Sequence, residues 1–170
     1  MKLVHKRPGD EAINDGHLRD EGGQKFMHYK KIFEVRWADL DPNFHMRNTA
    51  YLEYAEQVRI NYFTERGFPI RKFKELGFGP VLFSEKVEYL REIGPDEKIN
   101  VTCLLGGLST DGRKWRFYHQ VFRNDGIEAA RVTGDGAWLD ISTRKLRVPP
   151  DELLDILNSL ERTEDFISMM

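Results

Sequence analysis

A period of two marks the first regular segment of the chain, residues 29–37. Its apolar positions are Tyr29, Phe33, Val35 and Trp37, and the polar positions between them are Lys30, Glu34 and Arg36. Lys31 and Ile32 break the alternation near its start. Because successive side chains of a strand point to opposite faces, the segment predicts a strand with one buried face.

The spacing of apolar residues becomes helical after residue 48. The apolar positions recur at three- and four-residue steps and are Tyr51, Tyr54, Ala55, Val58 and Tyr62. This pattern predicts an amphipathic helix over residues 49–66. Asn48 is expected to cap its first turn and Gly67 to end it. A short second helix is expected over residues 70–76.

The second half of the chain is rich in β-branched and aromatic residues. It predicts four strands, over residues 81–90, 98–108, 113–124 and 127–141. Asp-Gly pairs stand between them at residues 111–112 and 125–126, where tight hairpin turns belong. Gly134 and Gly136 are expected to bend or bulge the last strand, and residues 151–160 predict a closing helix. The predicted fold is α+β, a curved antiparallel sheet of about five strands wrapped around one long helix.

These elements fall within residues 25–170, which we expect to form a single domain. Residues 1–24 carry turn-forming residues and only isolated apolar ones, so a flexible leader is expected there. The formal net charge of −2, with 32% charged residues, gives no basic field for nucleic acid. No apolar run approaches the ~18 residues of a membrane-spanning helix, and no signal peptide is visible, so we expect a cytoplasmic protein without a membrane partner. The single Cys103 excludes an internal disulfide and a cysteine-based zinc cluster.

The chemistry of the chain is concentrated in the loop between the first strand and the long helix. Asp41, Asn43 and His45 alternate along this loop, so its backbone can turn all three side chains toward one pocket. The helix that follows aims its unpaired N–H groups and the positive end of its dipole at the same place. A base, a polar clamp and an oxyanion binder side by side are the groups that thioester or ester hydrolysis requires.

The order of elements resembles the hotdog fold, and the loop resembles one branch of it. The residues that carry this are Asp39, Asp41, His45, Asn48, Tyr51 and Leu52, which look like the signature of the 4-hydroxybenzoyl-CoA thioesterase-like family. The spelling DPNFH at residues 41–45 is closer to plant acyl-ACP thioesterases. The stretch YLREIG at residues 89–94 resembles the group's second motif, in which a glutamate, here Glu92, assists hydrolysis. Residues 138–145 look like the last strand and its exit, so the resemblance covers about residues 26–148.

Two positions depart from the family's pattern. Phe44 stands where a glycine usually precedes the histidine, so the residue type does not provide a positive φ there. Arg47 replaces the first residue of an Asn-Asn pair. This arginine either reaches an anionic group of the substrate or stays in solvent.

The resemblance implies a role for each loop residue, beside which an ordinary structural role stays open. Asp41 is the general base on water or the nucleophile on the thioester carbon, whereas Asp39 is expected to be structural. His45 holds the carbonyl, tunes Asp41 or positions water; otherwise it only binds a backbone carbonyl. Asn43 is a polar clamp or a turn former, and Glu92 a second catalytic acid or a surface carboxylate.

The substrate site is expected to include the start of the helix and a basic cluster. Arg47, Asn48 and Thr49 belong to the first part. Arg144 and Lys145, near the end of the last strand, either bind the phosphates of coenzyme A or phosphopantetheine or are solvated charges. No residue spacing indicates a metal site, and no cofactor is expected. We expect the tyrosines of the long helix to be core or subunit contacts, and Glu56 to pair with Arg59 three residues on.

The leading hypothesis is a thioesterase of fatty acid metabolism that acts on acyl-CoA or acyl-ACP. A hydratase or dehydratase of the same fold is the alternative among enzymes, but such proteins place Asn before Pro in the loop, whereas Pro42 precedes Asn43 here. A non-catalytic acyl-ligand sensor is the third hypothesis. A homodimer or homotetramer is expected, because one curved sheet around one helix leaves strand edges open.

Overall fold

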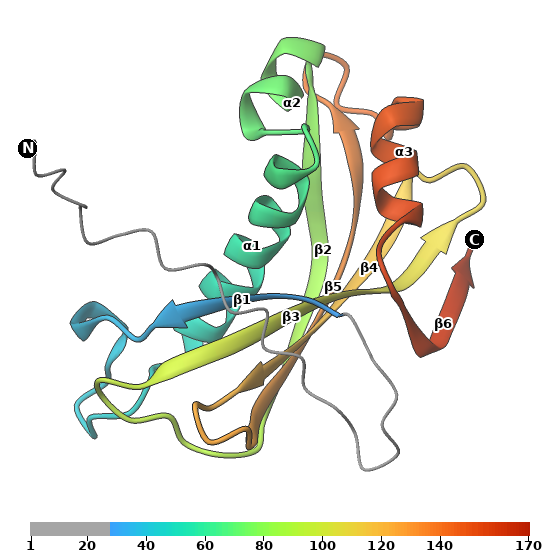
Figure 1. The fold of residues 1–170 in the computed structure, drawn as a ribbon. Helices are drawn as coiled ribbons and strands as arrows, with labels where there is room; N and C mark the ends of the chain where they lie inside the picture. Colours follow the sequence, from blue (N-terminus) through green and yellow to red (C-terminus); the bar gives the residue numbers. More distant parts are fainter. Residues whose placement is uncertain (1–27) are drawn as a thin grey trace, which may run out of the picture.

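A computed structural model describes residues 28–170, and the leader predicted over residues 1–24 lies outside them. Figure 1 shows one curved sheet with the long helix α1 lying against its concave face. The elements in chain order are β1 (Tyr29–Glu34), the short 3-10 helix η1 (Trp37–Asp39), α1 (Asn48–Glu65), α2 (Ile70–Leu76), β2 (Phe78–Tyr89), β3 (Lys98–Ser109), β4 (Lys114–Phe122), β5 (Glu128–Asp140), α3 (Asp151–Asn158) and β6 (Arg162–Met169).

The sheet has the strand order β1-β3-β4-β5-β2, and each of these neighbouring pairs is antiparallel. This confirms the predicted α+β arrangement of a curved sheet around one helix. A further strand, β6, is not predicted by the sequence pattern. It pairs in parallel with the second half of β3, beyond the stretch that β1 covers.

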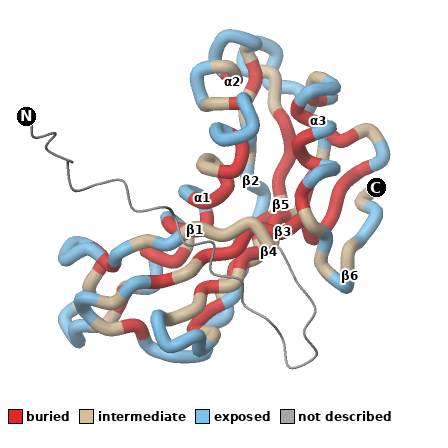
Figure 2. The backbone as a smooth tube through the Cα atoms, viewed as in Figure 1, coloured by how far each residue is buried: buried red, intermediate tan, exposed pale blue. Residues whose placement is uncertain are grey.

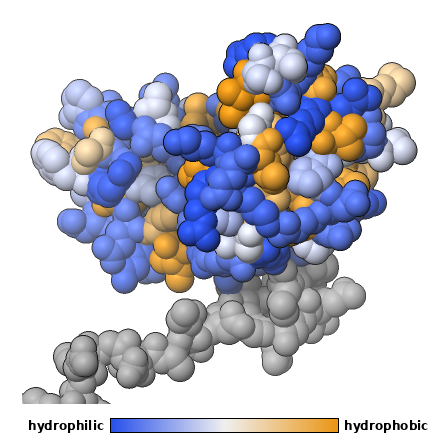
Figure 3. Space-filling model, turned by 90° about the horizontal axis from the view of Figure 1, so that it is seen from above, coloured by the Kyte–Doolittle hydropathy of each residue, from blue (hydrophilic) through white to orange (hydrophobic). Residues whose placement is uncertain are grey.

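The core lies between α1 and the inner face of the sheet, as the buried segments in Figure 2 show. On α1 the stripe predicted from the sequence is buried, with Ala55, Val58 and Tyr62 at 0% exposure. On β4 buried and half-buried residues alternate along the whole strand. Fully burying one such large apolar side chain stabilises the fold by about 1.5–3 kcal/mol. Seen from above in Figure 3, apolar side chains form separate patches among polar ones.

The start of α1 differs from the prediction, whereas its end agrees with it. The predicted cap is wrong by one residue, because Asn48 is the first helical residue and Arg47 holds the cap position without a side-chain hydrogen bond. Gly67 ends the helix as expected, with φ of 84°. Its amide bonds to the Thr64 carbonyl, and the Phe68 amide bonds to that of Phe63. These two bonds form a Schellman motif, which suits a left-handed glycine.

Strand β2 begins three residues before the predicted start and runs through Pro80. A proline is tolerated there because β2 is the edge strand next to β5, so an amide on its open side needs no partner. A bulge was expected in β5 near Gly134 and Gly136, but the irregularity lies in its partner strand β2. The register shifts between Leu82 and Ser84 of β2, which leaves Phe83 as a bulge.

Candidate active site

The loop between η1 and α1 closes on itself. Leu40 and Met46 form an isolated antiparallel bridge. Inside it, the Asp41 amide donates to the His45 carbonyl at 2.8 Å, and the Phe44 amide donates to the Asp41 carbonyl at 3.0 Å. Pro42 follows the first residue of the turn, where its fixed φ is favourable. Residues 41–45 therefore form a compact turn that presents its side chains outward.

Phe44 adopts a positive φ of 61° although it is not a glycine. The loop thus takes the backbone conformation for which a glycine is usual. The Phe44 side chain is 60% exposed, so burial of its ring contributes little to holding this backbone conformation. A bulky residue in this region costs about 1–3 kcal/mol, which the surrounding hydrogen bonds must offset.

The carboxylate of Asp41 is oriented by its own loop. Oδ1 accepts hydrogen bonds from the amides of Asn43 at 2.8 Å and His45 at 3.1 Å. Within residues 28–170, Oδ2 has no hydrogen-bond partner. One oxygen is therefore anchored while the other remains available to a water or a substrate.

The structure brings His45 and Glu92 together from two different segments. His45 Nε2 lies 3.4 Å from Glu92 Oε2, a distance that makes an ion pair when the imidazole is protonated. The Met46 amide donates to the Ile93 carbonyl at 2.8 Å and ties the two loops to each other. Both side chains are accessible, with Glu92 77% and His45 40% exposed. Asp41, His45 and Glu92 thus share one end of the molecule, as the sequence motifs predict.

The start of α1 adds backbone donors to this end. Neither the amide of Asn48 nor that of Thr49 has a hydrogen-bond partner among the described residues, and no side chain caps the helix. The helix dipole places partial positive charge on these free N–H groups. Tyr89 donates to the Asn48 carbonyl at 3.2 Å and joins this turn to the end of β2. The side chain of Asn43, by contrast, is exposed and makes no hydrogen bond within residues 28–170.

Tyr51 is a core residue, as expected for the tyrosines of the long helix, but its position beside these acidic groups was not predicted. It is 3% exposed, and its ring meets that of Tyr89 edge-on at 5.2 Å. Burial, together with the negative charges of Glu92, Glu97 and Asp41, raises the pKa of Tyr51 to about 12. The phenol therefore stays protonated and can donate a hydrogen bond. The available signal was its position three residues after Asn48, on the same face of the helix.

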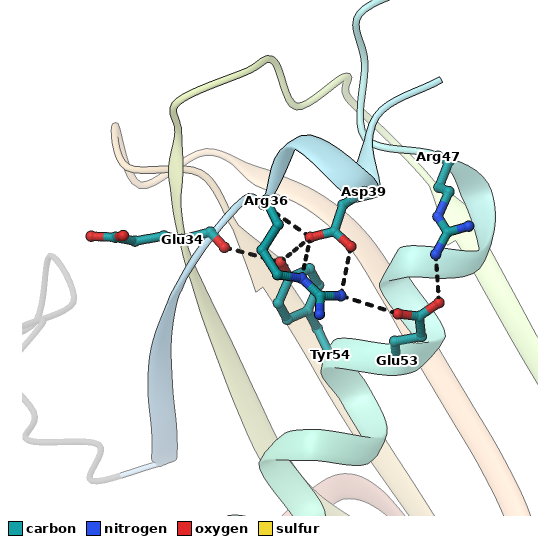
Figure 4. Close-up of polar contacts among 6 residues, drawn as sticks. All are labelled: Glu34, Arg36, Asp39, Arg47, Glu53 and Tyr54. Carbon is teal, nitrogen blue, oxygen red and sulfur yellow. Dashed lines mark hydrogen bonds and ion pairs between the residues drawn. The ribbon is translucent and has the colours of Figure 1, made fainter. Parts of the chain in front are cut away.

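Asp39 sits in a separate network at the outer side of the loop, shown in Figure 4. It is fully buried, and Arg36 donates to both of its oxygens while Tyr54 donates to Oδ2 at 2.5 Å. Burial alone would raise the pKa of Asp39, but the hydrogen bonds from Arg36 and Tyr54 outweigh it and lower the pKa to about 2. This is the environment of a structural carboxylate.

Arg47, which replaces the asparagine usual in the family, belongs to the same network. Arg47 Nη2 donates to Glu53 Oε1 at 2.8 Å, and Glu53 also accepts from Arg36 (Figure 4). Arg47 is thus paired with a helix carboxylate and joined through it to the Asp39 cluster. The guanidinium of Arg47 is therefore not free in solvent. Within residues 28–170, no hydrogen bond joins its side chain to Asp41.

Arg144 and Lys145 lie at the opposite end of the chain's sheet. In the β2–β5 ladder, Tyr89 pairs with Ala130 near the loop, whereas Phe78 pairs with Asp140 at the other end. The eleven residue steps from Phe78 to Tyr89 span roughly 36 Å of strand. In Figure 1 the loop after β5 accordingly lies beside α2, far from the loop between β1 and α1. Within one chain, the basic cluster does not join the Asp41 site.

The described part of the chain shows neither a metal-binding cluster nor a membrane-spanning helix. Among residues 28–170, no set of three or more His, Cys, Asp or Glu side chains is arranged to hold a metal ion. Within the same range, no helix has the length and apolar character needed to cross a membrane.

Comparison with known proteins identifies the family. Residues 35–157 match the family model described as the thioesterase-like superfamily, and the chain belongs to that superfamily. Among curated proteins no significant match is found.

Solved structures share the fold at low sequence identity. A hypothetical protein from Aquifex aeolicus has a TM-score of 0.70 at 24% identity, over 76% of this chain and 98% of that one. A hypothetical protein from Staphylococcus aureus, solved in complex with CoA, has a TM-score of 0.72 at 16% identity, over 84% of this chain and 89% of that one. A 1,4-dihydroxy-2-naphthoyl-CoA thioesterase from Synechocystis has a TM-score of 0.71 at 11% identity, over 78% of this chain and 96% of that one. The hotdog fold and the thioesterase resemblance are thereby confirmed.

Proposed function

We propose that this protein hydrolyses an acyl thioester at the Asp41 loop and releases a free acid and a thiol. The observation that carries the proposal is the Asp41 carboxylate, anchored through one oxygen and open at the other, next to an uncapped helix N-terminus. An ionised, oriented carboxylate beside free N–H donors is the pair of groups that acyl transfer to water requires.

In this mechanism Asp41 takes a proton from a water molecule as the water oxygen attacks the thioester carbon. The carbonyl oxygen becomes an oxyanion, which the free amides of Asn48 and Thr49 stabilise together with the helix dipole. Collapse of the tetrahedral intermediate breaks the carbon–sulfur bond, and the thiolate leaves and takes up a proton. Direct attack by Asp41 on the same carbon, followed by hydrolysis of the anhydride, is the alternative course.

His45 and Glu92 complete the proposed machinery. Their side chains lie 3.4 Å apart, so the carboxylate can hold the imidazole in one orientation. In this position His45 binds the attacking water or the thioester carbonyl, and in its protonated form it supplies the proton for the thiolate. Asn43 is at most a peripheral contact, because its side chain projects into solvent.

We further propose that the active unit is a homodimer paired through β2. β2 is the edge strand of the described sheet, paired with β5 on one side and open on the other within residues 28–170, and its exposed apolar residues are Leu82, Phe83 and Tyr89. Such an edge is a ready surface for an identical strand. An antiparallel pair of β2 strands sets Tyr89 of one copy beside Phe78 of the other. That arrangement brings Arg144 and Lys145 of the second copy toward the Asp41 loop of the first, where they can bind phosphate.

The proposed substrate is an acyl-CoA or an acyl carrier protein thioester. Two neighbours of the same fold support the CoA form, one by its bound CoA and one by its name as a CoA thioesterase. The Arg144–Lys145 cluster suits the phosphates of either carrier. A hydratase acting on the same thioester, or a non-catalytic acyl sensor, are the alternatives that the experiment must separate.

A panel of acyl-CoAs incubated with the protein and a thiol-reactive dye separates the three functions. Release of free thiol is the result expected, and it should depend on Asp41. A change in enoyl absorbance without thiol would identify a hydratase. Binding without either signal would identify a sensor and contradict hydrolysis.

A further inference from the structure

The exposed pair of His45 and Glu92 gives little stability of its own, although the proposed reaction depends on its geometry. Glu92 is 77% and His45 40% exposed, and their side chains are 3.4 Å apart. Exposed ion pairs contribute little, because water weakens the attraction and two mobile side chains must be held in one arrangement. Glu92 lies in the loop between β2 and β3, outside both strands. Its orientation toward His45 therefore depends on how firmly this loop holds its backbone.

The residues that follow Glu92 fix the conformation of this loop. The Ile93 side chain is fully buried and anchors the loop in the core. The Gly94 amide donates to Glu97 Oε1 at 2.8 Å, which closes the turn. Asp96, between Gly94 and Glu97, has a positive φ of 60°, a value uncommon for a residue other than glycine. Such a conformation persists where the surrounding contacts determine the backbone.

Glu97 ties this loop to the strand that leads into the catalytic loop. Its backbone carbonyl accepts from the Val35 amide at 3.0 Å, directly after β1. The second carboxylate oxygen, Oε2, faces the guanidinium of Arg123, with 3.6 Å between Oε2 and Nε. Glu97 is therefore joined to three segments of the chain, namely the end of β1, the Glu92 loop and the hairpin after β4.

Arg123 reaches the backbone of Glu92 itself. It is the first residue after β4, and its Nη1 donates to the Glu92 carbonyl at 3.4 Å. Its Nη2 pairs with Asp125 of the same hairpin at 3.0 Å, and its buried Nε faces Glu97. One side of the guanidinium thus belongs to the hairpin and the other to the Glu92 loop. Within residues 28–170, neither Arg123 nor Glu97 has a hydrogen bond or ion pair with His45.

We propose that Arg123 and Glu97 are positioning residues of the active site, which keep the Glu92 carboxylate beside His45. Both act indirectly. They fix the backbone from which Glu92 extends, and Glu92 orients the imidazole that binds the water or the thioester carbonyl. A misplacement of about 1 Å that starts away from the reacting atoms can cost about 100-fold in rate. The inference rests on the proposed thioester hydrolysis and adds two residues to its site.

The test is a double-mutant cycle, with thiol release from one good acyl-CoA as the readout. Arg123→Met keeps most of the side-chain length and removes the donors. Its kcat should fall about tenfold, while KM changes by less than about twofold. In a Glu92→Ala background the same substitution should change kcat by less than about twofold, because Arg123 acts through the Glu92 carboxylate. A loss of stability alone would not depend on the side chain at position 92.

Variants of the neighbouring carboxylates complete the cycle. Glu97→Ala removes both contacts of the Glu97 carboxylate and should lower kcat as Arg123→Met does. Glu97→Gln keeps an oxygen that can accept from the Gly94 amide and should retain most of the turnover. Asp125→Asn is the matched control, because it weakens only the ion pair of Arg123 within the hairpin and should leave kcat unchanged.

The outcomes separate this inference from the function on which it rests. If the unaltered protein releases no thiol from any acyl-CoA, the proposed hydrolysis fails and the inference fails with it. If thiol is released and Glu92→Ala keeps full turnover, hydrolysis stands and the inference is overturned. An equal loss of kcat for Arg123→Met with and without the Glu92 side chain would assign Arg123 a purely structural role and also overturn it. If Arg123→Met does not fold, Glu97→Ala in the same cycle decides by the same criterion.

Discussion

At the scale of single residues, the two aspartates of the loop have opposite surroundings although they are two positions apart. Asp39 is buried and bound by Arg36 and Tyr54. Asp41 is half-buried, and among the described residues its carboxylate is bound by two amides of its own turn, both on one oxygen. The resemblance to the thioesterase family suggested different roles for the two aspartates, and their contacts differ in the same sense.

Phe44→Gly should stabilise the protein. Glycine adopts the φ of 61° found at this position without strain, and little apolar burial is lost because the ring is 60% exposed. The free energy of unfolding should rise by about 1 kcal/mol. Thermal unfolding measures the change, which should be an increase of about 2–4 °C. Phe44→Ala removes the ring but keeps the Cβ and should bring no comparable gain; equal gains in both variants would assign the effect to the ring.

Asp39→Asn should destabilise the protein by about 1–3 kcal/mol near neutral pH, because it weakens charged hydrogen bonds to a buried group. Folding lowers the pKa of Asp39 from 3.8 to about 2, so its stabilisation is complete above pH 4 and is lost as the pH falls toward 2. Denaturant unfolding across this range should show the difference between the two proteins shrinking. The exposed control Asp155→Asn should show almost no difference at any pH. A constant difference for Asp39→Asn would mean that its charge is not involved.

At the scale of elements, the periodic segments were predictable from the sequence and the pairings that depend on distant partners were not. The stripe of α1 and the alternation of β4 follow directly from residue spacing. β6 has no comparable pattern, and its place is set by parallel pairing with β3, where Gly107 admits the side chain of Ile167. The positive φ of Phe44 was likewise hidden, because hydrogen bonds of the loop impose it.

Arg59 shows how residue type can mislead where position is informative. An arginine near a glutamate on a helix normally predicts a surface ion pair. Yet residue 59 falls four positions after Ala55 and three before Tyr62, within the buried stripe. The helical spacing puts Arg59 on the buried face of α1, whereas its charge alone would predict an exposed position. The spacing was the better guide.

The open edge of β2 leads to a prediction about assembly. Phe83→Glu should weaken the proposed homodimer, because it places a charge at the centre of the edge that the second copy would cover. Light scattering at micromolar concentration should show a shift toward monomer. Ile127→Glu changes a residue of similar exposure in the hairpin between β4 and β5 and should leave the mass unchanged. A monomeric mass for the unaltered protein would contradict the pairing altogether.

At the scale of the whole molecule, the two expected parts of the substrate site lie at opposite ends of one sheet. A dimer through β2 would reunite them across subunits, with the loop from one copy and the basic cluster from the other. The proposed site is therefore a property of the pair, whereas the Asp41–His45–Glu92 group belongs to one chain.

Mixing two impaired variants tests this arrangement. Asp41→Asn lacks the base, and a double variant with Arg144→Glu and Lys145→Glu lacks the phosphate site. In a mixed dimer, the intact loop of one subunit meets the intact cluster of the other. Random mixing should therefore restore about a quarter of the unaltered turnover, since half of the dimers hold one complete site. Activity no higher than the sum of the separate variants would place both parts of the site in one subunit.

The central claim is that the free oxygen of Asp41 drives thioester hydrolysis, and turnover of one good acyl-CoA by Asp41→Asn tests it most directly. The amide oxygen can still accept from Asn43 and His45, so the loop and the melting temperature should be preserved. The rate of thiol release should fall about 10²–10⁴-fold, because the amide can neither take a proton nor attack a carbonyl. Asp39→Asn should retain most of its turnover at a temperature where it is folded. Full activity in Asp41→Asn beside an inactive, folded Asp39→Asn would contradict the account.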